Sequence, residues 1–266
     1  MGIVNVTPDS FSDGGRLAGP SAAVEHALRL AGAGADILDI GGESTRPGAL
    51  AVDADEEMRR VLPVIEALAG RIAAAISVDT TKAVVARAAL RAGAHIVNDV
   101  SAGTQDPDMV AAVRQEGAGI VLMHMRGNPR TMQADPRYAD VVADVREYLA
   151  RRIEDLARAG VPAEAMAVDP GIGFGKTTAH NLALLAGLGA FVTIGRPVVV
   201  GHSRKRFIGD LTGRPVDERL AGSLAAAAAA VLKGANVLRV HDVAPTRDAA
   251  RVAAAIAAAG AGQGQG

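Results

Sequence analysis

The sequence predicts a (β/α)8 barrel, and two patterns along its 266 residues support this fold class. Eight short runs rich in β-branched residues alternate with eight longer helical stretches, which is typical of a parallel sheet covered by helices. Turns of small residues centred on glycine precede several of the expected strands. Eight such units in a chain of this length favour a closed TIM barrel. A doubly wound open sheet is the alternative, because it is built from the same units.

The expected strands are largely apolar, as strands buried on both faces should be. They cover residues 2–6, 37–40, 75–79, 96–99, 120–124, 166–169, 197–201 and 237–240. The expected helices are amphipathic or alanine-rich and cover residues 21–33, 53–68, 82–92, 107–116, 138–159, 178–188, 217–233 and 246–259. A glycine follows five of these helices, where it favours the left-handed conformation that ends a helix: Gly34, Gly93, Gly117, Gly160 and Gly234.

Composition restricts the domain organisation and the class of partner. No composition break divides the chain, so we expect one domain over residues 1–259 and a flexible Gly- and Gln-rich tail over residues 260–266. The formal net charge of −1 favours neither nucleic acid nor an anionic membrane as a partner. The lack of cysteine rules out disulfides and thiolate metal sites and fits a cytoplasmic protein. No apolar run is long enough to span a bilayer.

Polar residues at the carboxyl ends of barrel strands are typical of catalytic sites. Asp79, Asn98 and Asp169 end three different strands and suit the N–H-rich edge of a planar heterocycle. The Gly-rich segment 171–175 allows the backbone to approach a ligand closely. A second group is cationic, or can become so, and suits an anion: Arg46, Arg204, Lys205, Arg239 and His241. A heterocycle joined to a phosphate group would satisfy both groups.

Structural explanations compete with these assignments. Asp79 or Asp169 could cap a helix, and Arg239 could form an ion pair at the barrel rim. Packing is the preferred explanation for His124 and His202. To exclude a ligand site, a structural explanation would have to be correct at most of the strand ends at the same time. The sequence therefore favours a ligand site.

Seven motifs, in order from Gly2 to about Ala255, resemble the dihydropteroate synthase family of pterin-binding enzymes. They are GIVNVTPDSFSDGG (2–15), GGESTRPG (41–48), SVDT (77–80), VNDVS (97–101), DPGIGFGK (169–176), SRKRFIG (203–209) and RVHDV (239–243). Each motif alone is moderately specific, and the assignment rests on their number and order. The family usually carries an N-terminal β-hairpin. Here Met1 directly precedes Gly2, so we expect that hairpin to be absent.

The resemblance implies an enzyme that condenses 6-hydroxymethyl-7,8-dihydropterin diphosphate with 4-aminobenzoate, giving 7,8-dihydropteroate and pyrophosphate with Mg²⁺ as cofactor. The family's (β/α)8 fold agrees with the strand count. The residues it implies to be catalytic are Asn5, Asp79, Asn98, Asp169, Lys205, Arg239 and His241, with Asn5 linked to the metal. The residues it implies to bind substrate are Thr7, Asp9, Phe11, Asp13, Thr45, Arg46, Pro47, Met123, Gly173, Phe174 and Ser203.

Within this set, the pterin pocket comprises Asp79, Asn98, Met123, Asp169 and Lys205. The anion site comprises Asn5, Arg239 and His241. The aminobenzoate pocket comprises Thr45, Arg46, Pro47, Phe174 and Lys205, with Ser203 at its edge. The segments 7–15 and 43–49 correspond to the family's two mobile loops, which we expect to close over the site.

The expected chemistry is an SN1-like step. Pyrophosphate leaves readily once cations neutralise its charge, and the dihydropterin ring can delocalise the positive charge left on the methylene carbon. The neutral aniline nitrogen then attacks without a strong general base. Family members are commonly homodimers through late helices, and the alanine-rich stretch 225–230 offers a smooth face, although it could equally pack against its own barrel.

Two other functions compete with this one. A corrinoid-linked methyltetrahydrofolate methyltransferase would share the barrel and the acidic pocket, but it would not need the STRPG segment, Arg239 or His241. A non-catalytic pterin-binding paralogue should have lost pocket residues, whereas the set here is intact.

Overall fold

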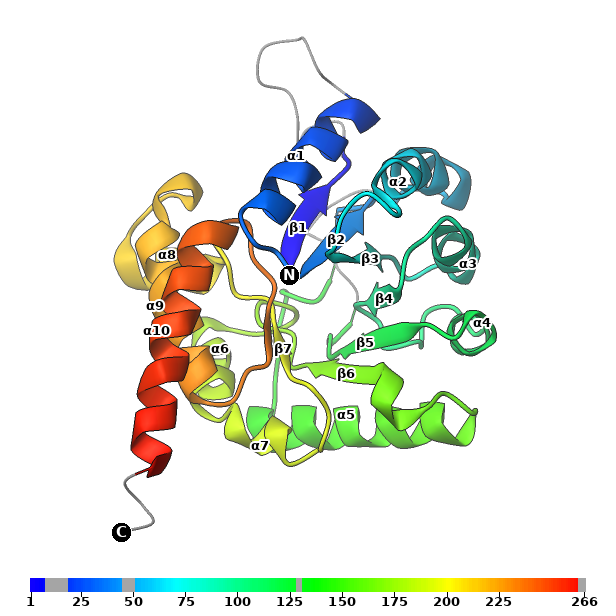
Figure 1. Ribbon diagram of the computed structural model, residues 1–266. Coiled ribbons are helices and arrows are strands. Elements are labelled where there is room, and N and C mark those ends of the chain that lie inside the picture. Colours follow the sequence, from blue (N-terminus) through cyan, green and yellow to red (C-terminus); the bar gives the residue numbers. More distant parts are fainter. Residues whose placement is uncertain (8–18, 45–50, 128–130, 263–266) are drawn as a thin grey trace.

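Parallel strands surround a central axis and helices cover them from outside in the computed structural model, which describes residues 1–7, 19–44, 51–127 and 131–262 (Figure 1). The described strands are β1 (Gly2–Asn5), β2 (Ile37–Gly41), β3 (Ala75–Asp79), β4 (Ile96–Asp99), β5 (Gly119–Met123), β6 (Met166–Asp169), β7 (Val199–Val200) and β8 (Val237–Leu238). Strands β1 to β6 pair in sequence order, and β7 pairs with β8.

Two single bridges close this arrangement into a barrel. Val168 pairs with Val198 between β6 and β7, and Gly2 pairs with Val240 between β8 and β1. The backbone N–H of Ile3 donates to the carbonyl of Val240 at 3.0 Å across the second junction. The predicted (β/α)8 class is therefore confirmed, and the open doubly wound alternative is wrong.

The helices follow the predicted alternation. They are α1 (Pro20–Gly32), α2 (Ala54–Leu68), α3 (Ala83–Arg91), α4 (Met109–Glu116), α5 (Val141–Arg158), α6 (Thr178–Ala186), α7 (Gly189–Val192), α8 (Arg206–Thr212), α9 (Leu220–Leu232) and α10 (Val243–Gly262). All five predicted helix-ending glycines have positive φ. Asp53, Asp140 and Thr177 accept hydrogen bonds from backbone N–H groups at the starts of α2, α5 and α6, as N-cap residues do.

The structure differs from the sequence prediction mainly in the last third. Helix α8 lies between β7 and α9, where the pattern predicts no helix, because its seven residues are too few to show a helical period. The helix predicted from residue 217 begins at Leu220, after a short 3-10 turn over Val216–Glu218. Helix α10 continues to Gly262, three residues past the predicted end of the domain.

The core is aliphatic, as the scarcity of aromatic residues requires. Leu38, Ile40, Ile76 and Ile120 are almost completely buried, and alanines on the helices allow close packing against the strands. Because the strands are buried on both sides, their carboxyl ends are where polar side chains can gather. Among the described residues, no helix is both long and apolar enough to cross a membrane.

Candidate active site

Strand register brings the predicted pterin-pocket residues to one end of the barrel. Asp79 on β3 pairs with Asn98 on β4, and Met123 on β5 pairs with Asp169 on β6. All four side chains are buried, whereas Asn5 at the end of β1 is partly exposed. The structure therefore places three predicted acceptors and a methionine on four consecutive strands at the predicted mouth.

A network of charged groups links these strands across the barrel interior. Arg239 donates from Nε to Asp39 Oδ2 at 2.6 Å and from Nη2 to Asp79 Oδ2 at 2.7 Å. The same Asp39 oxygen accepts from Asn98 Nδ2 at 3.0 Å. Because the amide nitrogen of Asn98 is held by Asp39, its carbonyl oxygen is left as the group that can accept from a ligand.

Asp39 is a member of this network that the sequence does not identify as a site residue. It is completely buried on β2, and it is surrounded in sequence by apolar residues. An aspartate inside an otherwise apolar strand is the one sequence signal that could have identified it, since buried carboxylates are normally paired. Arg239 does form ion pairs, and its partners Asp39 and Asp79 are buried whereas Arg239 itself is partly exposed.

Burial and neighbouring charges shift the pKa values of the pocket residues. Burial raises the pKa of Asp79 to about 7, although Arg239 acts against this shift. Burial also raises the pKa of Asp169, against the charge of Lys205. Burial lowers the pKa of Lys205 to about 8, while Asp169 opposes the change. The pKa of Arg239 stays above its ordinary value despite burial, because Asp39 and Asp79 stabilise its charge.

The Gly-rich segment after β6 contacts two residues of this cluster, Asp169 and Lys205. Its first turn is held by Asp169, whose Oδ1 accepts from the N–H of Gly171 at 2.7 Å. Lys205 donates to the carbonyl of Ile172, and its Nζ lies 4.5 Å from the centre of the Phe174 ring. Phe174 and Lys205, both predicted for the aminobenzoate pocket, are therefore in direct contact.

The two other predicted cationic residues in the described part of the chain, His241 and Arg204, have different kinds of partner. His241 Nδ1 lies 3.0 Å from Ser203 Oγ, so these two predicted residues form a pair at the mouth. Arg204 instead binds Asp242 through both Nε (2.9 Å) and Nη2 (2.7 Å), which neutralises its charge in a bidentate ion pair. The expectation that Arg204 serves as an anion ligand therefore has no support in this geometry.

The two histidines assigned to packing are both buried. His202 Nε2 lies 3.1 Å from the carbonyl of Ser223, and burial lowers its pKa to about 4. His124 is also buried, but its Nδ1 lies 3.0 Å from Lys176 Nζ. His124 thus has a specific polar partner that the packing explanation does not include.

Part of the predicted site cannot be placed. Asp9, Phe11 and Asp13, together with Thr45, Arg46 and Pro47, lie outside the described residues. Thr7 and Gly173 are described and are partly exposed. The roles assigned to all these residues stay predictions.

Asn5 is the residue to which the resemblance assigns a metal contact. No group of three or more His, Cys, Asp or Glu side chains within the described ranges could hold a metal ion. Mg²⁺ in phosphate-transfer sites usually takes few protein ligands and completes its shell with substrate phosphates and water. A single partly exposed amide at the carboxyl end of β1, the end of the barrel where the other site residues lie, fits that kind of shared site.

Comparisons with known proteins agree with this geometry. The family model described as pterin binding enzyme matches residues 1–241. The dihydropteroate synthase of Escherichia coli (strain K12) is 49% identical over 252 residues, which cover 95% of this chain and 89% of that protein.

Solved structures give the same result. The Xanthomonas albilineans dihydropteroate synthase with 4-aminobenzoic acid is 54% identical, with a TM-score of 0.91 and coverage of 96% of this chain and 92% of that one. The same enzyme in complex with 7,8-dihydropteroate is 51% identical, with a TM-score of 0.88 and the same coverage. The chain belongs to the pterin-binding enzyme family, among the dihydropteroate synthases.

Proposed function

We propose that this chain condenses 6-hydroxymethyl-7,8-dihydropterin diphosphate with 4-aminobenzoate and releases 7,8-dihydropteroate and pyrophosphate. The observation that carries the proposal is the gathering of three acceptor side chains, Asp79, Asn98 and Asp169, in one buried cluster with Arg239 and Lys205. The related synthases argue against a corrinoid-linked methyltransferase, and the intact pocket argues against a non-catalytic paralogue.

The acceptors would hold the N–H-rich edge of the pterin. Asp79 accepts from Arg239 through Oδ2, and its carboxylate has further acceptor sites for a pterin N–H. A guanidinium has five N–H donors, and Arg239 uses one on Nε for Asp39 and one on Nη2 for Asp79, so its other N–H groups can donate to the diphosphate. Arg239 would in this way connect the pterin pocket with the anion site.

The leaving diphosphate would be stabilised by the cations around the mouth. Arg239 and His241 would contact its oxygens, and Asn5 would contribute an amide oxygen to Mg²⁺ that the diphosphate also binds. When bound, Mg²⁺ neutralises part of the charge that develops on the leaving group. The protein groups orient the carbon–oxygen bond for heterolysis and hold the pterin edge, so that the ring can take up the positive charge.

Aminobenzoate would bind beside Phe174 and Lys205, with Ser203 at the edge of its pocket. The flat ring of Phe174 can pack against the aromatic acid, and Lys205 stands at 4.5 Å from that ring. Thr45, Arg46 and Pro47 would complete the pocket from the second loop, and closure of residues 7–15 and 43–49 would keep water from the cation.

A cytoplasmic location stays a prediction from the sequence.

A coupled assay of pyrophosphate release tests the proposed reaction. Release should require the pterin diphosphate, aminobenzoate and Mg²⁺ together, and omission of any one should abolish sustained turnover. Mass spectrometry should find dihydropteroate in an amount equal to the pyrophosphate. Pyrophosphate release without dihydropteroate would indicate hydrolysis and would contradict the proposal.

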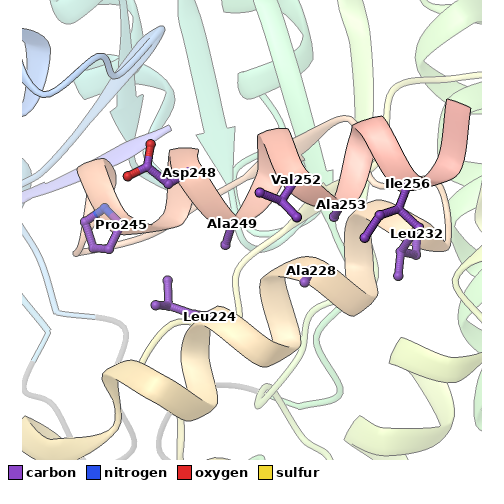
Figure 2. A pocket seen from close by; sticks show the side chains of 9 residues that line it. All are labelled: Leu224, Ala228, Leu232, Pro245, Asp248, Ala249, Val252, Ala253 and Ile256. Carbon is purple, nitrogen blue, oxygen red and sulfur yellow. The ribbon is translucent and has the colours of Figure 1, made fainter. Parts of the chain in front are cut away.

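We also propose that the protein forms a homodimer through α9 and α10. A groove between these two helices is almost entirely apolar, as Figure 2 shows. Its lining residues are Leu224, Ala228, Leu232, Pro245, Asp248, Ala249, Val252, Ala253 and Ile256.

The exposure of this groove supports a second copy of the chain as its occupant. Val252 is 62% exposed and Ile256 is 58% exposed, which is unusual for large apolar side chains on neighbouring turns of one helix. Alanines between them would let two copies approach closely around a two-fold axis, with the same face on each partner.

A further inference from the structure

Lys176 is a buried lysine to which the proposed chemistry gives no role. It is the last residue of the DPGIGFGK motif, two residues after Phe174, and is 3% exposed. A lysine is rarely buried unless its amine is fully paired. Its surroundings should therefore show which part of the molecule it holds.

Three acceptors surround the amine of Lys176. Nζ lies 3.0 Å from His124 Nδ1, and it donates to the carbonyls of His124 at 3.2 Å and of Phe174 at 2.9 Å. An ammonium group has three N–H donors, so these contacts use all of them. The amine therefore ties the end of β5 to the backbone of Phe174.

The charge states of the pair fit this arrangement while the pH is below the pKa of Lys176, because only the ammonium form supplies three donors. Burial lowers the pKa of His124 to about 3, and the charge of Lys176 acts in the same direction, so the imidazole is neutral and its Nδ1 can accept. Burial lowers the pKa of Lys176 to about 7, while Asp169 opposes this shift and Lys205 adds to it. The Tyr138 ring, 6.0 Å from Nζ, also faces the amine.

The loop around Phe174 is held from several sides. Gln133 Nε2 donates to the carbonyl of Gly173 at 2.6 Å, and the Tyr138 hydroxyl donates to the carbonyl of Gly175 at 2.8 Å. Asn181 Oδ1 accepts from the N–H of Gly173 at 2.7 Å. Among the carbonyls of residues 173–175, that of Phe174 is the one that accepts from Lys176. Lys176 therefore fixes the backbone of the residue whose ring contacts Lys205.

We propose that Lys176, together with His124, is a positioning residue for aminobenzoate, because it fixes the backbone of Phe174 and hence the place of its ring against Lys205. The aminobenzoate part of this inference rests on the proposed function. The loop part does not, since it concerns only contacts within the chain. Lys176 does not touch substrate in this arrangement and is not a catalytic residue.

Hydrogen exchange tests the loop without any reference to activity. In Lys176→Met, which keeps an unbranched side chain but removes the donors, amide exchange over residues 173–176 should accelerate by at least about tenfold relative to wild type, because the local opening free energy falls. Lys233→Met is the matched control, since Lys233 is exposed at the end of α9. Equal exchange in Lys176→Met and the control would overturn the proposal.

Steady-state kinetics test the positioning role. Lys176→Met should raise KM for aminobenzoate about tenfold and change KM for the pterin diphosphate less than about threefold. The reason is that a misplaced Phe174 ring affects the aminobenzoate pocket, of which it is a wall, and not the pterin pocket. Partial unfolding would lower kcat through the fraction of active enzyme and leave both KM values unchanged. Equal rises in both KM values, or a fall in kcat alone, would overturn the positioning role.

The partner residue provides a rescue experiment. His124→Asn can place an amide oxygen near the position of Nδ1 and should keep aminobenzoate KM close to wild type, whereas His124→Leu should behave like Lys176→Met. The double variant of His124→Leu and Lys176→Met should be no worse than either single variant, because the two residues act as one unit. Additive losses would contradict a paired role. If the wild type does not condense the two substrates, the proposed function fails, and the exchange experiment still decides whether Lys176 holds the loop.

Discussion

At the scale of single residues, the site depends on pairings that the sequence cannot show. Arg239 is 200 residues from Asp39 and 160 from Asp79, yet it binds both. The sequence identifies Asp79 and Arg239 through their motifs and their places at strand ends. It does not identify Asp39, because a lone acidic residue in a strand has no local pattern that marks its partner. Likewise, the bidentate pair of Arg204 with Asp242 depends on how two strand ends meet.

The raised pKa of Asp79 leads to a prediction about stability. Its pKa is about 7 in the folded protein against an ordinary value of 3.8, so between these values the folded state binds more protons than the unfolded state. The free energy of unfolding must then fall as the pH rises through this window. Asp79→Asn removes this contribution, and the substitution should therefore be less harmful at high pH than at low pH.

Thermal unfolding measures this effect. The difference in Tm between Asp79→Asn and wild type should move in favour of the variant by at least about 2 °C between about pH 5 and about pH 7.5. Asp135→Asn, at an exposed site, serves as the control and should show no such trend. A Tm difference that is constant across this range would mean that folded Asp79 titrates at its ordinary pKa.

At the scale of elements, local pattern predicts most of the barrel and fails where elements are short. The bounds of β3, β4 and β6 agree with the prediction, because each is an apolar run between a glycine turn or short loop and a polar strand end. Strands β7 and β8 are only two residues long, because Val198 and Val240 near them pair with β6 and β1 through single bridges and not through continuous ladders. Helix α8 begins directly after Lys205, and its sequence is dominated by the SRKRFIG motif rather than by an apolar stripe.

The face formed by α9 and α10 gives an element-scale prediction. If this face is the dimer interface, wild-type protein should show twice the chain mass of 27.0 kDa by light scattering. Val252→Arg should shift the protein toward the monomer, because it places a charge in an apolar contact. Val84→Arg on α3 replaces a similarly exposed valine on the other side of the barrel and should leave the mass unchanged (Figure 1). A wild type that is monomeric at micromolar concentration would contradict the dimer proposal.

At the scale of the whole molecule, the barrel places acceptors and cations from different strands around one point. The acceptors lie on β3, β4 and β6, while the cations follow β7 and β8. This separation lets one end of a substrate be held by hydrogen bonds while the other end loses an anion. The number and order of motifs indicate this from sequence alone, because barrel topology brings all strand ends to one mouth. Which charged residues pair with each other across the mouth can be seen only in the structure of the closed barrel.

The central claim is that the mouth of this barrel breaks the bond between the pterin methylene carbon and the diphosphate before aminobenzoate attacks. It can be tested with pterin diphosphate that carries a heavy-oxygen label in the bridge between the methylene and phosphorus. With enzyme and Mg²⁺ but no aminobenzoate, reversible cleavage should move the label into non-bridging positions, which phosphorus NMR detects. Label that stays in the bridge, in an enzyme preparation that turns over once aminobenzoate is added, would contradict the dissociative step.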